Sequence, residues 1–223
     1  MRKGFGICCI MLGICCLIAS AGLIAYNHWE EENAQNTSKT ILQDVRKSIL
    51  SNARGEISQE ENTREEIISE ETIPEKVSQD ESAEISTDSQ QETSAAQVDD
   101  YECGGLLSIP ALELELPVLT EWSYAKLKIA PCIYYGSCIE KDFVIAAHNY
   151  KSHFGRLSEL QPKDLIMFTD ISGMVYCYEV VLLETLPADA TEEMITSGFD
   201  LSLYTCTPGG ANRVTVRCNA MGK

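Results

Sequence analysis

The sequence predicts a mainly β domain that follows one N-terminal membrane-spanning helix. Residues 4–26 carry no charged side chain, residues 27–100 are polar and acidic, and residues 101–223 have the composition of a globular domain. Within 101–223, seven or eight short apolar or alternating segments are separated by turn signals, which is typical of a β-barrel or a β-sandwich. The chain is therefore expected to hold one folded domain of about 120 residues.

The apolar run 4–26 is long enough to cross a bilayer. At about 1.5 Å per residue, a helix of this length spans the roughly 30 Å hydrocarbon core. Basic residues lie in segment 1–3 and glutamates occupy 30–32, so the N-terminus should stay on the cytoplasmic side. Tyr26 and Trp29 would then lie at the outer interface. We expect a single-pass protein of the cell membrane with an extracellular C-terminal domain.

A cleaved signal peptide is the alternative interpretation of this run. The tripeptide Ala19-Ser20-Ala21 resembles a signal-peptidase site. A retained anchor is favoured because the apolar residues continue beyond that site. Both interpretations carry the C-terminal domain across the membrane.

The segment 27–100 is expected to be a flexible stalk. It is rich in Glu, Ser, Thr and Gln, and such a composition buries too little apolar surface to offset the entropy of ordering the chain. Parts of it, such as 40–49, have a helical period, which predicts a short helix there. Most of the formal net charge of −17 lies in this segment. A chain this acidic is a poor candidate for binding nucleic acid.

The C-terminal domain shows strand patterns with two short helical links. Leucines at 112, 114 and 116 alternate with glutamates, as on a strand with one buried face. Thr120 is a plausible N-cap and Pro131 a stop signal for a helix between them. The predicted strands are 106–110, 112–119, 142–147, 165–171, 174–186, 201–207 and 213–219, and the predicted helical segments are 120–130 and 154–160.

Six of the ten cysteines lie in the C-terminal domain, and the other four lie in the apolar run. The six form no C-x-x-C pair, and the histidines do not fall at zinc-finger spacing, so no structural metal site is expected. An extracellular location would permit disulfides. Cys132 and Cys138 are the closest pair in sequence, but the spacing leaves the connectivity open.

Three residues are candidates for catalysis. Cys206 ends an apolar strand at a Gly-rich turn, Arg213 opens the next predicted strand, and His148 follows the strand 142–147. A thiolate is a strong nucleophile, a nearby imidazole can move the proton, and a guanidinium can stabilise an oxyanion. Together these groups suffice for acyl transfer from a peptide. Each could instead be a packed or solvated residue, and His153 is a weaker alternative base.

Several short motifs follow one another along 107–213. They are the Ile-Pro and Pro-Val pairs within 107–118, IAAHN at 145–149, F-x-x-L-x-x-L at 154–160, KDLI at 163–166, SLYTC at 202–206 and Arg213. With this set of motifs, the stretch from about 105 to 216 resembles the sortase family of Gram-positive bacteria. Departures from the family pattern are Ala147 before the histidine, Ser202 for the signature threonine, and Lys163 for a usual glycine.

The resemblance implies a closed eight-stranded β-barrel and a cysteine transpeptidase. Cys206 would attack the threonine carbonyl of an LPXTG-type C-terminal sorting signal on a secreted protein and form a thioacyl-enzyme. His148 would act as acid and base, and Arg213 would hold the substrate and the oxyanion. An amine of a cell-wall precursor or of a pilin lysine would then accept the acyl group.

The resemblance also bears on regulation and cofactors. Residues 30–110 contain no Asp-Pro-aromatic plug, so a lidded pilus enzyme is less expected. The loop 187–199 should form one wall of the substrate groove. Glu192 and Glu193 in that loop could assist a calcium ion, although two solvated acids are the simpler interpretation. No other cofactor is expected.

Two rival classes compete with this interpretation. The first is a cell-wall cysteine peptidase of another fold. Papain-like peptidases place the cysteine before the histidine in the chain, whereas here His148 precedes Cys206. The other rival is a non-enzymatic, membrane-anchored surface module whose cysteine and histidine belong to the core.

Overall fold

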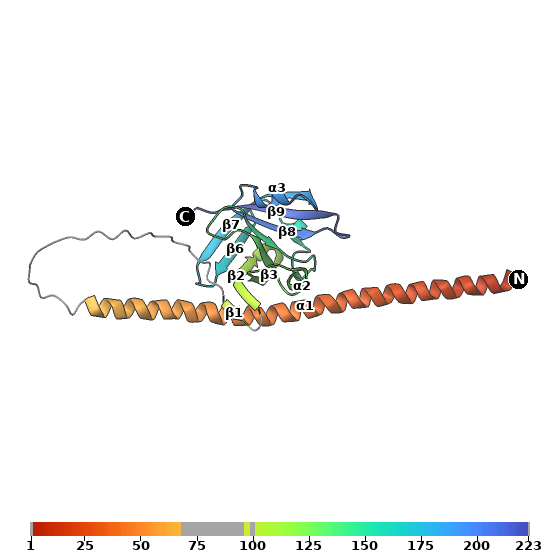
Figure 1. Ribbon diagram of the computed structural model, residues 1–223, viewed down its shortest axis with the longest axis horizontal. Coiled ribbons are helices and arrows are strands. Elements are labelled where there is room, and N and C mark those ends of the chain that lie inside the picture. Colours follow the sequence, from red (N-terminus) through yellow and green to blue (C-terminus); the bar gives the residue numbers. More distant parts are fainter. Residues whose placement is uncertain (1, 68–95, 99–100, 223) are drawn as a thin grey trace, which may run out of the picture.

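The computed structural model describes residues 2–67, 96–98 and 101–222 and shows a β-barrel lying against one long helix (Figure 1). The helices are α1 (Arg2–Ile67), α2 (Tyr124–Leu127) and α3 (Thr191–Ile195), with 3-10 turns at Pro110–Leu112 and Leu157–Glu159. The strands are β1 (Ala96–Val98), β2 (Tyr101–Ile109), β3 (Leu114–Leu119), β4 (Cys132–Tyr135), β5 (Phe143–Ala146), β6 (Leu165–Asp170), β7 (Val175–Pro187), β8 (Leu201–Cys206) and β9 (Asn212–Ala220).

Eight strands close into a barrel, as predicted. Their order is β2-β3-β4-β5-β8-β9-β7-β6, and β6 pairs back with β2 through positions such as Leu107 and Phe168. The short strand β1 pairs only with the start of β2. The pairs β3–β4 and β5–β8 are parallel and the others are antiparallel. Closure removes the exposed edges that an open sheet would have.

Alternate residues of the strands fill the barrel interior. Phe143 and Phe168 meet edge to face with ring centroids 5.1 Å apart, a favourable arrangement for aromatic rings. Burial of one such side chain stabilises the fold by roughly 1.5–3 kcal/mol. Other members of this core are Leu107, Ile109, Ile145, Ala147, Ile166, Leu201, Leu203, Val216 and Cys218.

Two local elements differ from the sequence prediction. The helix expected over 120–130 is only the single turn α2, and its N-cap is Ser123, whose Oγ accepts a hydrogen bond from the Lys126 N–H at 3.1 Å. Thr120 instead continues the sheet, since its N–H donates to the Glu102 carbonyl at 3.0 Å. Strand β4 was not predicted, because four residues after a proline carry too little pattern to be distinguished from a loop.

Helix α1 runs without interruption to Ile67, so the flexible stalk expected from residue 27 is not what the structure shows over 27–67. Ile41, Val45 and Ile49 recur every four residues and are buried against the barrel beside Leu106. A stripe this narrow leaves the mean composition polar, which is why composition alone predicted disorder. The rest of the predicted stalk, 68–95 and 99–100, lies outside the described residues.

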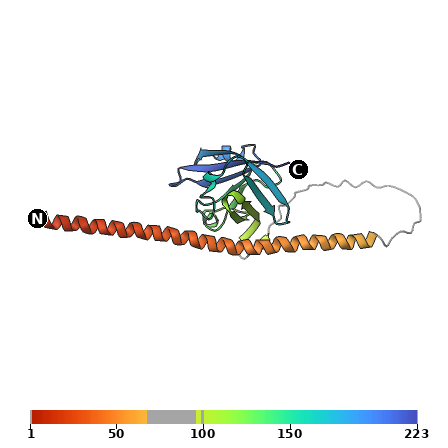
Figure 2. The ribbon, with the colours of Figure 1, turned by 180° about the vertical axis from the view of Figure 1, so that it is seen from behind.

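Polar contacts accompany the apolar stripe along α1. The helix passes beneath the barrel and extends well beyond it in both directions (Figures 1 and 2). The contacts are Glu30 with Lys128 Nζ at 2.5 Å, Glu31 Oε1 with the Lys151 N–H at 2.7 Å, Arg46 with Glu115, and Asn52 Nδ2 with the Ile171 carbonyl at 3.0 Å. The docked face of α1 therefore extends from Glu30 to Asn52.

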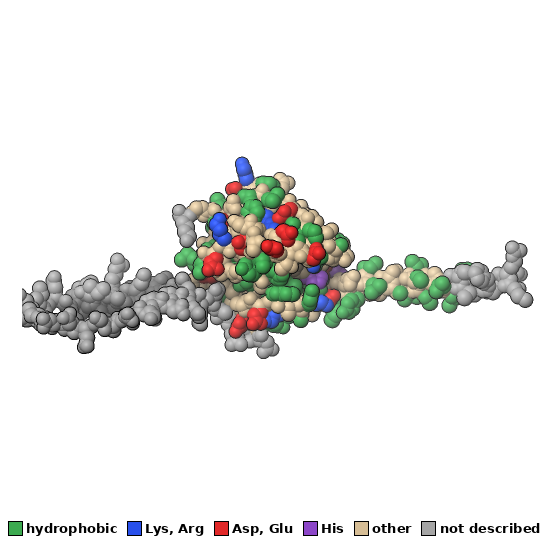
Figure 3. Space-filling view, turned by 45° about the horizontal axis from the view of Figure 1, so that its top comes forward, with side chains coloured by type: hydrophobic (Ala, Val, Ile, Leu, Met, Phe, Trp, Pro, Cys, Tyr) green, Lys and Arg blue, Asp and Glu red, His purple; other side chains and the backbone are tan. Residues whose placement is uncertain are grey.

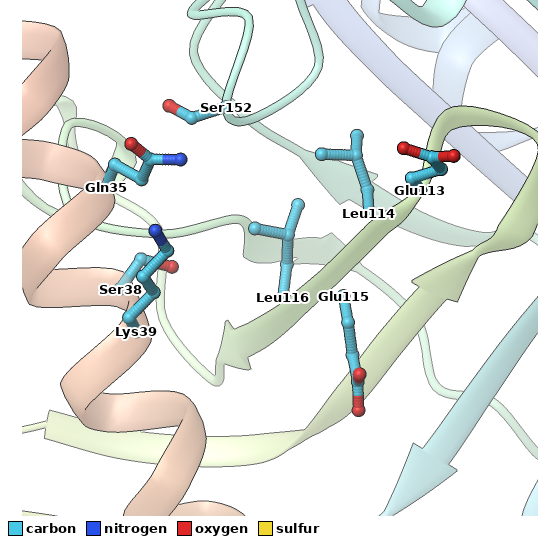
Figure 4. A pocket seen from close by; sticks show the side chains of 8 residues that line it. All are labelled: Gln35, Ser38, Lys39, Glu113, Leu114, Glu115, Leu116 and Ser152. Atoms are coloured by element: carbon cyan, nitrogen blue, oxygen red, sulfur yellow. The ribbon is translucent and has the colours of Figure 1, made fainter.

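A cavity of about 120 Å³ lies between α1 and β3 (Figure 4). The Oγ atoms of Ser38 and Ser152 are buried there and make no hydrogen bond with the described residues. None of the three predicted site residues lines it. The other lining residues are Gln35, Lys39, Glu113, Leu114, Glu115 and Leu116.

We expect Val45→Asp to release α1 while the barrel stays folded. Val45 is fully buried in the contact, and a carboxylate there would lose apolar burial and be desolvated, at a cost of about 2 kcal/mol or more. Hydrogen exchange of the amides of 34–52 in the full chain should accelerate. Leu50→Asp is the matched control, because Leu50 is 71% exposed on the same helix. Unchanged protection in Val45→Asp would contradict docking by this stripe.

We expect Lys163→Gly to stabilise the domain by about 1 kcal/mol and to raise Tm by about 2–4 °C. Lys163 is exposed and has φ of 82°, a left-handed conformation that strains any residue with a Cβ atom. Lys163→Ala keeps the Cβ and should give no such gain. Thermal unfolding of both variants measures the difference, and equal Tm values would show that this backbone is unstrained.

Candidate active site

Cys206 and Arg213 face each other across a tight turn. Cys206 is the last residue of β8, and its partner in the antiparallel pairing with β9 is Arg213. The turn between them needs Gly209 and Gly210, whose φ values of 84° and 76° suit glycine. Arg213 Nη1 donates to the carbonyls of Gly210 and Asn212 at 2.9 and 3.1 Å, which holds the guanidinium at this end of the barrel.

His148 lies at the same level on the other side of Cys206. Strands β5 and β8 run parallel, with Ala146 opposite Tyr204. The pairing continues beyond the strand end, because Ala147 N–H donates to the Tyr204 carbonyl at 3.2 Å and Thr205 Oγ1 donates to the Ala147 carbonyl at 2.8 Å. Continued by two residues beyond Ala146 and Tyr204, this register sets His148 near Cys206, the last residue of β8.

All three side chains belong to the outer face of the barrel wall. Side chains alternate between the faces of a strand, so the neighbours of core residues point outward. Ala147 and Leu203 are core residues, and Val214 packs against the same core. The next outward positions at this end of the barrel are His148, Cys206 and Arg213. The structure thus brings the three predicted residues to one end of adjacent strands, with His148 just after β5, Cys206 at the end of β8 and Arg213 near the start of β9.

The imidazole of His148 is half-buried and stacks on Tyr150, with ring centroids 4.0 Å apart and planes 18° apart. Burial lowers the pKa of His148 below its ordinary value and outweighs the nearby Glu30 carboxylate, which acts in the opposite direction. Nδ1 of His148 is buried and makes no hydrogen bond with the described residues. The ring is therefore held by stacking, and burial favours its neutral form.

His153, the alternative base, is fully buried. Burial lowers its pKa to about 4, with a further contribution from His148. The backbone of Ile129 lies close, but neither ring nitrogen makes a hydrogen bond with the described residues. His153 is a packed, neutral histidine rather than a group at the surface.

The cysteines of the domain differ sharply in exposure. Burial raises the pKa of Cys103 to about 11, and of Cys132 and Cys218 to about 12, so these thiols stay protonated and inert. Cys138 is partly buried and its pKa is raised for the same reason. The exposed thiols of the described domain are Cys177 and Cys206. Cys132 and Cys138 are both free thiols in this structure.

One residue of the site region escaped the sequence analysis. Arg217 is 2% exposed, and its guanidinium donates to Glu184 Oε1 at 2.7 Å and to Ser202 Oγ at 2.8 Å. It also donates to the Glu193 carbonyl at 2.8 Å, which pins α3 onto the outer face of β8 and β9. An arginine four positions from another on one strand gives no sequence signal of this role. Arg217 thus fixes the loop that was expected to wall the groove.

This closed barrel, with a cysteine, a histidine and an arginine at one end of three adjacent strands, has the architecture of the β-barrel transpeptidases. The family model described as the Sortase domain matches residues 107–221, slightly more than half of the chain. The chain belongs to the sortase family.

Solved structures of sortases share the fold. Sortase A from Corynebacterium diphtheriae is 21% identical, covers 56% of this chain and 63% of its own, and has a TM-score of 0.50. Sortase C from Streptococcus pneumoniae is 24% identical, with coverages of 57% and 69% and a TM-score of 0.49. Sortase D5 from Clostridium perfringens is 19% identical, with coverages of 54% and 79% and a TM-score of 0.48.

The chain thus spans less than two thirds of the Corynebacterium structure. No curated protein matches it. At these identities the structural likeness establishes the fold alone.

The buried histidine predicts a pH dependence of stability. The pKa of His153 falls from about 6.5 unfolded to about 4 folded, so the unfolded chain binds more protons between these values. Above pH 6.5 the titration of His153 does not change the free energy of unfolding. As the pH falls from 6.5 toward 4, this titration lowers the free energy of unfolding by about 3 kcal/mol.

His153→Leu should therefore gain stability relative to the wild type as the pH is lowered from 7 to 4.5. Urea unfolding of the full chain in detergent at both pH values measures this gain. The exposed His28 supplies the control variant His28→Gln. If the gap between His153→Leu and the wild type stayed constant with pH, His153 would not titrate on unfolding as described.

Proposed function

We propose that this sortase cleaves an LPXTG-type C-terminal sorting signal between threonine and the next residue, and transfers the secreted protein to an amine of the cell wall or of a pilin. The observation that supports this proposal is that Cys206 and Arg213 pair across β8 and β9, while the strand that leads to His148 pairs with β8 at the same end of the barrel. Acyl transfer from a peptide needs a nucleophile, a proton carrier and an oxyanion donor within a few ångströms of one carbonyl.

Cys206 is the proposed nucleophile. Cys206 passes its thiol proton to the neutral ring of His148, which becomes an imidazolium. The resulting thiolate bonds to the threonine carbonyl carbon, and the carbonyl electrons move to the oxygen. Collapse of the oxyanion breaks the C–N bond and leaves a thioacyl-enzyme. The departing amine takes a proton from the imidazolium of His148, so the C-terminal piece leaves as a neutral amine. The exposure of Cys206 gives the substrate access to the sulfur.

His148 then acts in the opposite direction. Its neutral ring removes a proton from the incoming amine, which bonds to the thioacyl carbon and expels the Cys206 thiolate. The lowered pKa of His148 favours this neutral form in the resting enzyme. Stacking on Tyr150 keeps the ring in one plane during both proton transfers.

Arg213 is the proposed oxyanion and substrate donor. Its Nη1 is engaged by two carbonyls of the β8–β9 turn, so the guanidinium is already positioned before substrate arrives. Preorganised donors of this kind cost little reorganisation when charge develops in the transition state.

The N-terminal part of α1 supports a membrane-anchored enzyme. One helix of the described residues is long and apolar enough to cross a membrane, and its apolar window lies near the N-terminus. Arg2 and Lys3 precede the run, which supports a cytoplasmic N-terminus and an extracellular barrel. Secreted proteins that carry sorting signals would then meet the barrel as they emerge. A calcium role for Glu192 and Glu193 stays a prediction, as does the absence of any other cofactor.

The decisive variant is Cys206→Ala in the full chain. We expect cleavage of an LPXTG-type peptide to fall by at least about 10³-fold, because the covalent path disappears. Cys177→Ala is the matched control, since Cys177 is the other exposed thiol of the described domain, and it should retain activity within twofold. Arg213→Ala should lower the rate by about 10²–10³-fold, the usual cost of one oxyanion donor.

Mass spectrometry of the enzyme with peptide should show a thioacyl adduct on Cys206, and chromatography should follow cleavage. Cleavage that persists in Cys206→Ala would refute the nucleophile. If the wild type neither cleaves nor forms an adduct with any candidate signal peptide, the surface-module alternative gains support.

A further inference from the structure

Because α1 is a continuous helix, the position of a residue along it gives that residue's distance from the end of the membrane span. If the span ends at Tyr26, Glu30 lies about 6 Å farther along the helix axis, at about 1.5 Å per residue. Asn52, the last docked residue, lies about 33 Å beyond Glu30 by the same measure. Since Glu30 contacts Lys128 and Asn52 contacts Ile171, the barrel has a membrane-proximal end and a membrane-distal end.

The active site lies at the proximal end. Glu31 of α1 accepts the Lys151 N–H, and Lys151 follows Tyr150, which stacks on His148. Glu30 is also near enough to His148 to influence its pKa. In Figures 1 and 2, the turn joining β8 and β9 projects on the side where α1 leaves for its N-terminus. Figure 3 shows histidine side chains at this same end of the barrel.

Exposed aromatic side chains lie at this end as well. Trp122 and Tyr124 are 41% and 81% exposed and pack edge to face at 5.7 Å. They lie just before and at the start of α2, and Lys128, the partner of Glu30, follows α2 directly. They are therefore close to the level of Glu30 along α1. Exposed Trp and Tyr at a membrane boundary are typical of the lipid interface, where an apolar ring and a polar group are both accommodated.

We infer that α1 holds the Cys206 end of the barrel against the bilayer surface, with Trp122 and Tyr124 inserted in the interfacial layer. The inference rests on the membrane anchor of the proposed function. Aromatic insertion rather than charge carries it, because Lys126 and Lys128 are paired with Glu121 and Glu30. Zwitterionic lipid should therefore suffice. Peptide cleavage would take place at the membrane surface rather than at the tip of a long stalk.

Two tryptophans make the test possible, since the chain contains only Trp29 and Trp122. The full chain is reconstituted in phosphatidylcholine vesicles containing a lipid with a spin label near the headgroup. Trp29→Phe leaves Trp122 as reporter, and Trp122→Phe leaves Trp29. A distal reporter is M174W in the chain lacking both native tryptophans, because Met174 is 59% exposed three residues after Ile171.

We expect the Trp122 reporter to be quenched to within twofold of the Trp29 reporter, and the M174W reporter to be quenched at least fivefold less. Adding Val45→Asp should reduce quenching of Trp122 and leave that of Trp29 unchanged, because only the barrel is released. Quenching of Trp29 alone, with Trp122 as weakly quenched as the distal reporter, overturns the inference but keeps the anchor. Absence of quenching at Trp29 overturns the anchor itself and the inference with it.

Discussion

The parallel pairing of β5 with β8 is the constraint on which the site depends. Parallel neighbours must be joined by a long connection, and here the residues from 147 to 200 supply it, including β6, β7 and α3. The pairing places two strand ends at one end of the barrel, one leading to His148 and the other at Cys206. The antiparallel turn to β9 then adds Arg213 at the same level. A slip of one residue would move these side chains from the outer face to the core.

The second constraint is the outer wall built around that register. Arg217 satisfies its guanidinium entirely with groups from β7, β8 and the α3 segment, including Glu184 and Ser202. Removing the Glu184 carboxylate would leave the buried guanidinium charge uncompensated and would destabilise this wall of the barrel. Ser202, which stands where the family signature has threonine, accepts one of these hydrogen bonds through its Oγ. The loop that carries Glu192 and Glu193 is consequently a fixed wall rather than a free flap.

Much of the barrel and the three site positions could be predicted from sequence, because strand periodicity and the motif around Cys206 are local signals. The docking of the segment 27–67 on the barrel could not be predicted in this way. Its docking depends on Ile41, Val45 and Ile49 meeting an apolar patch more than 50 residues away in sequence, and the mean composition of the segment hides them. Arg217 was missed for a similar reason, since its partners come from three elements. The helical period over 40–49 predicts a helix there, but a local pattern does not identify the distant surface that the helix contacts.

Docking and chemistry meet at His148. The segment 148–153 packs against α1 through the Lys151 N–H, so the His148 ring shares its surroundings with the helix that carries the apolar N-terminal run. Burial lowers the pKa of His148, while Glu30 on α1 acts to raise it and Lys128 acts to lower it. Lys128 also forms an ion pair with Glu30, so its positive charge partly cancels the effect of the Glu30 carboxylate on the pKa of His148. The neutral ring required for acceptance of a proton is thus a property of the barrel and the docked helix together.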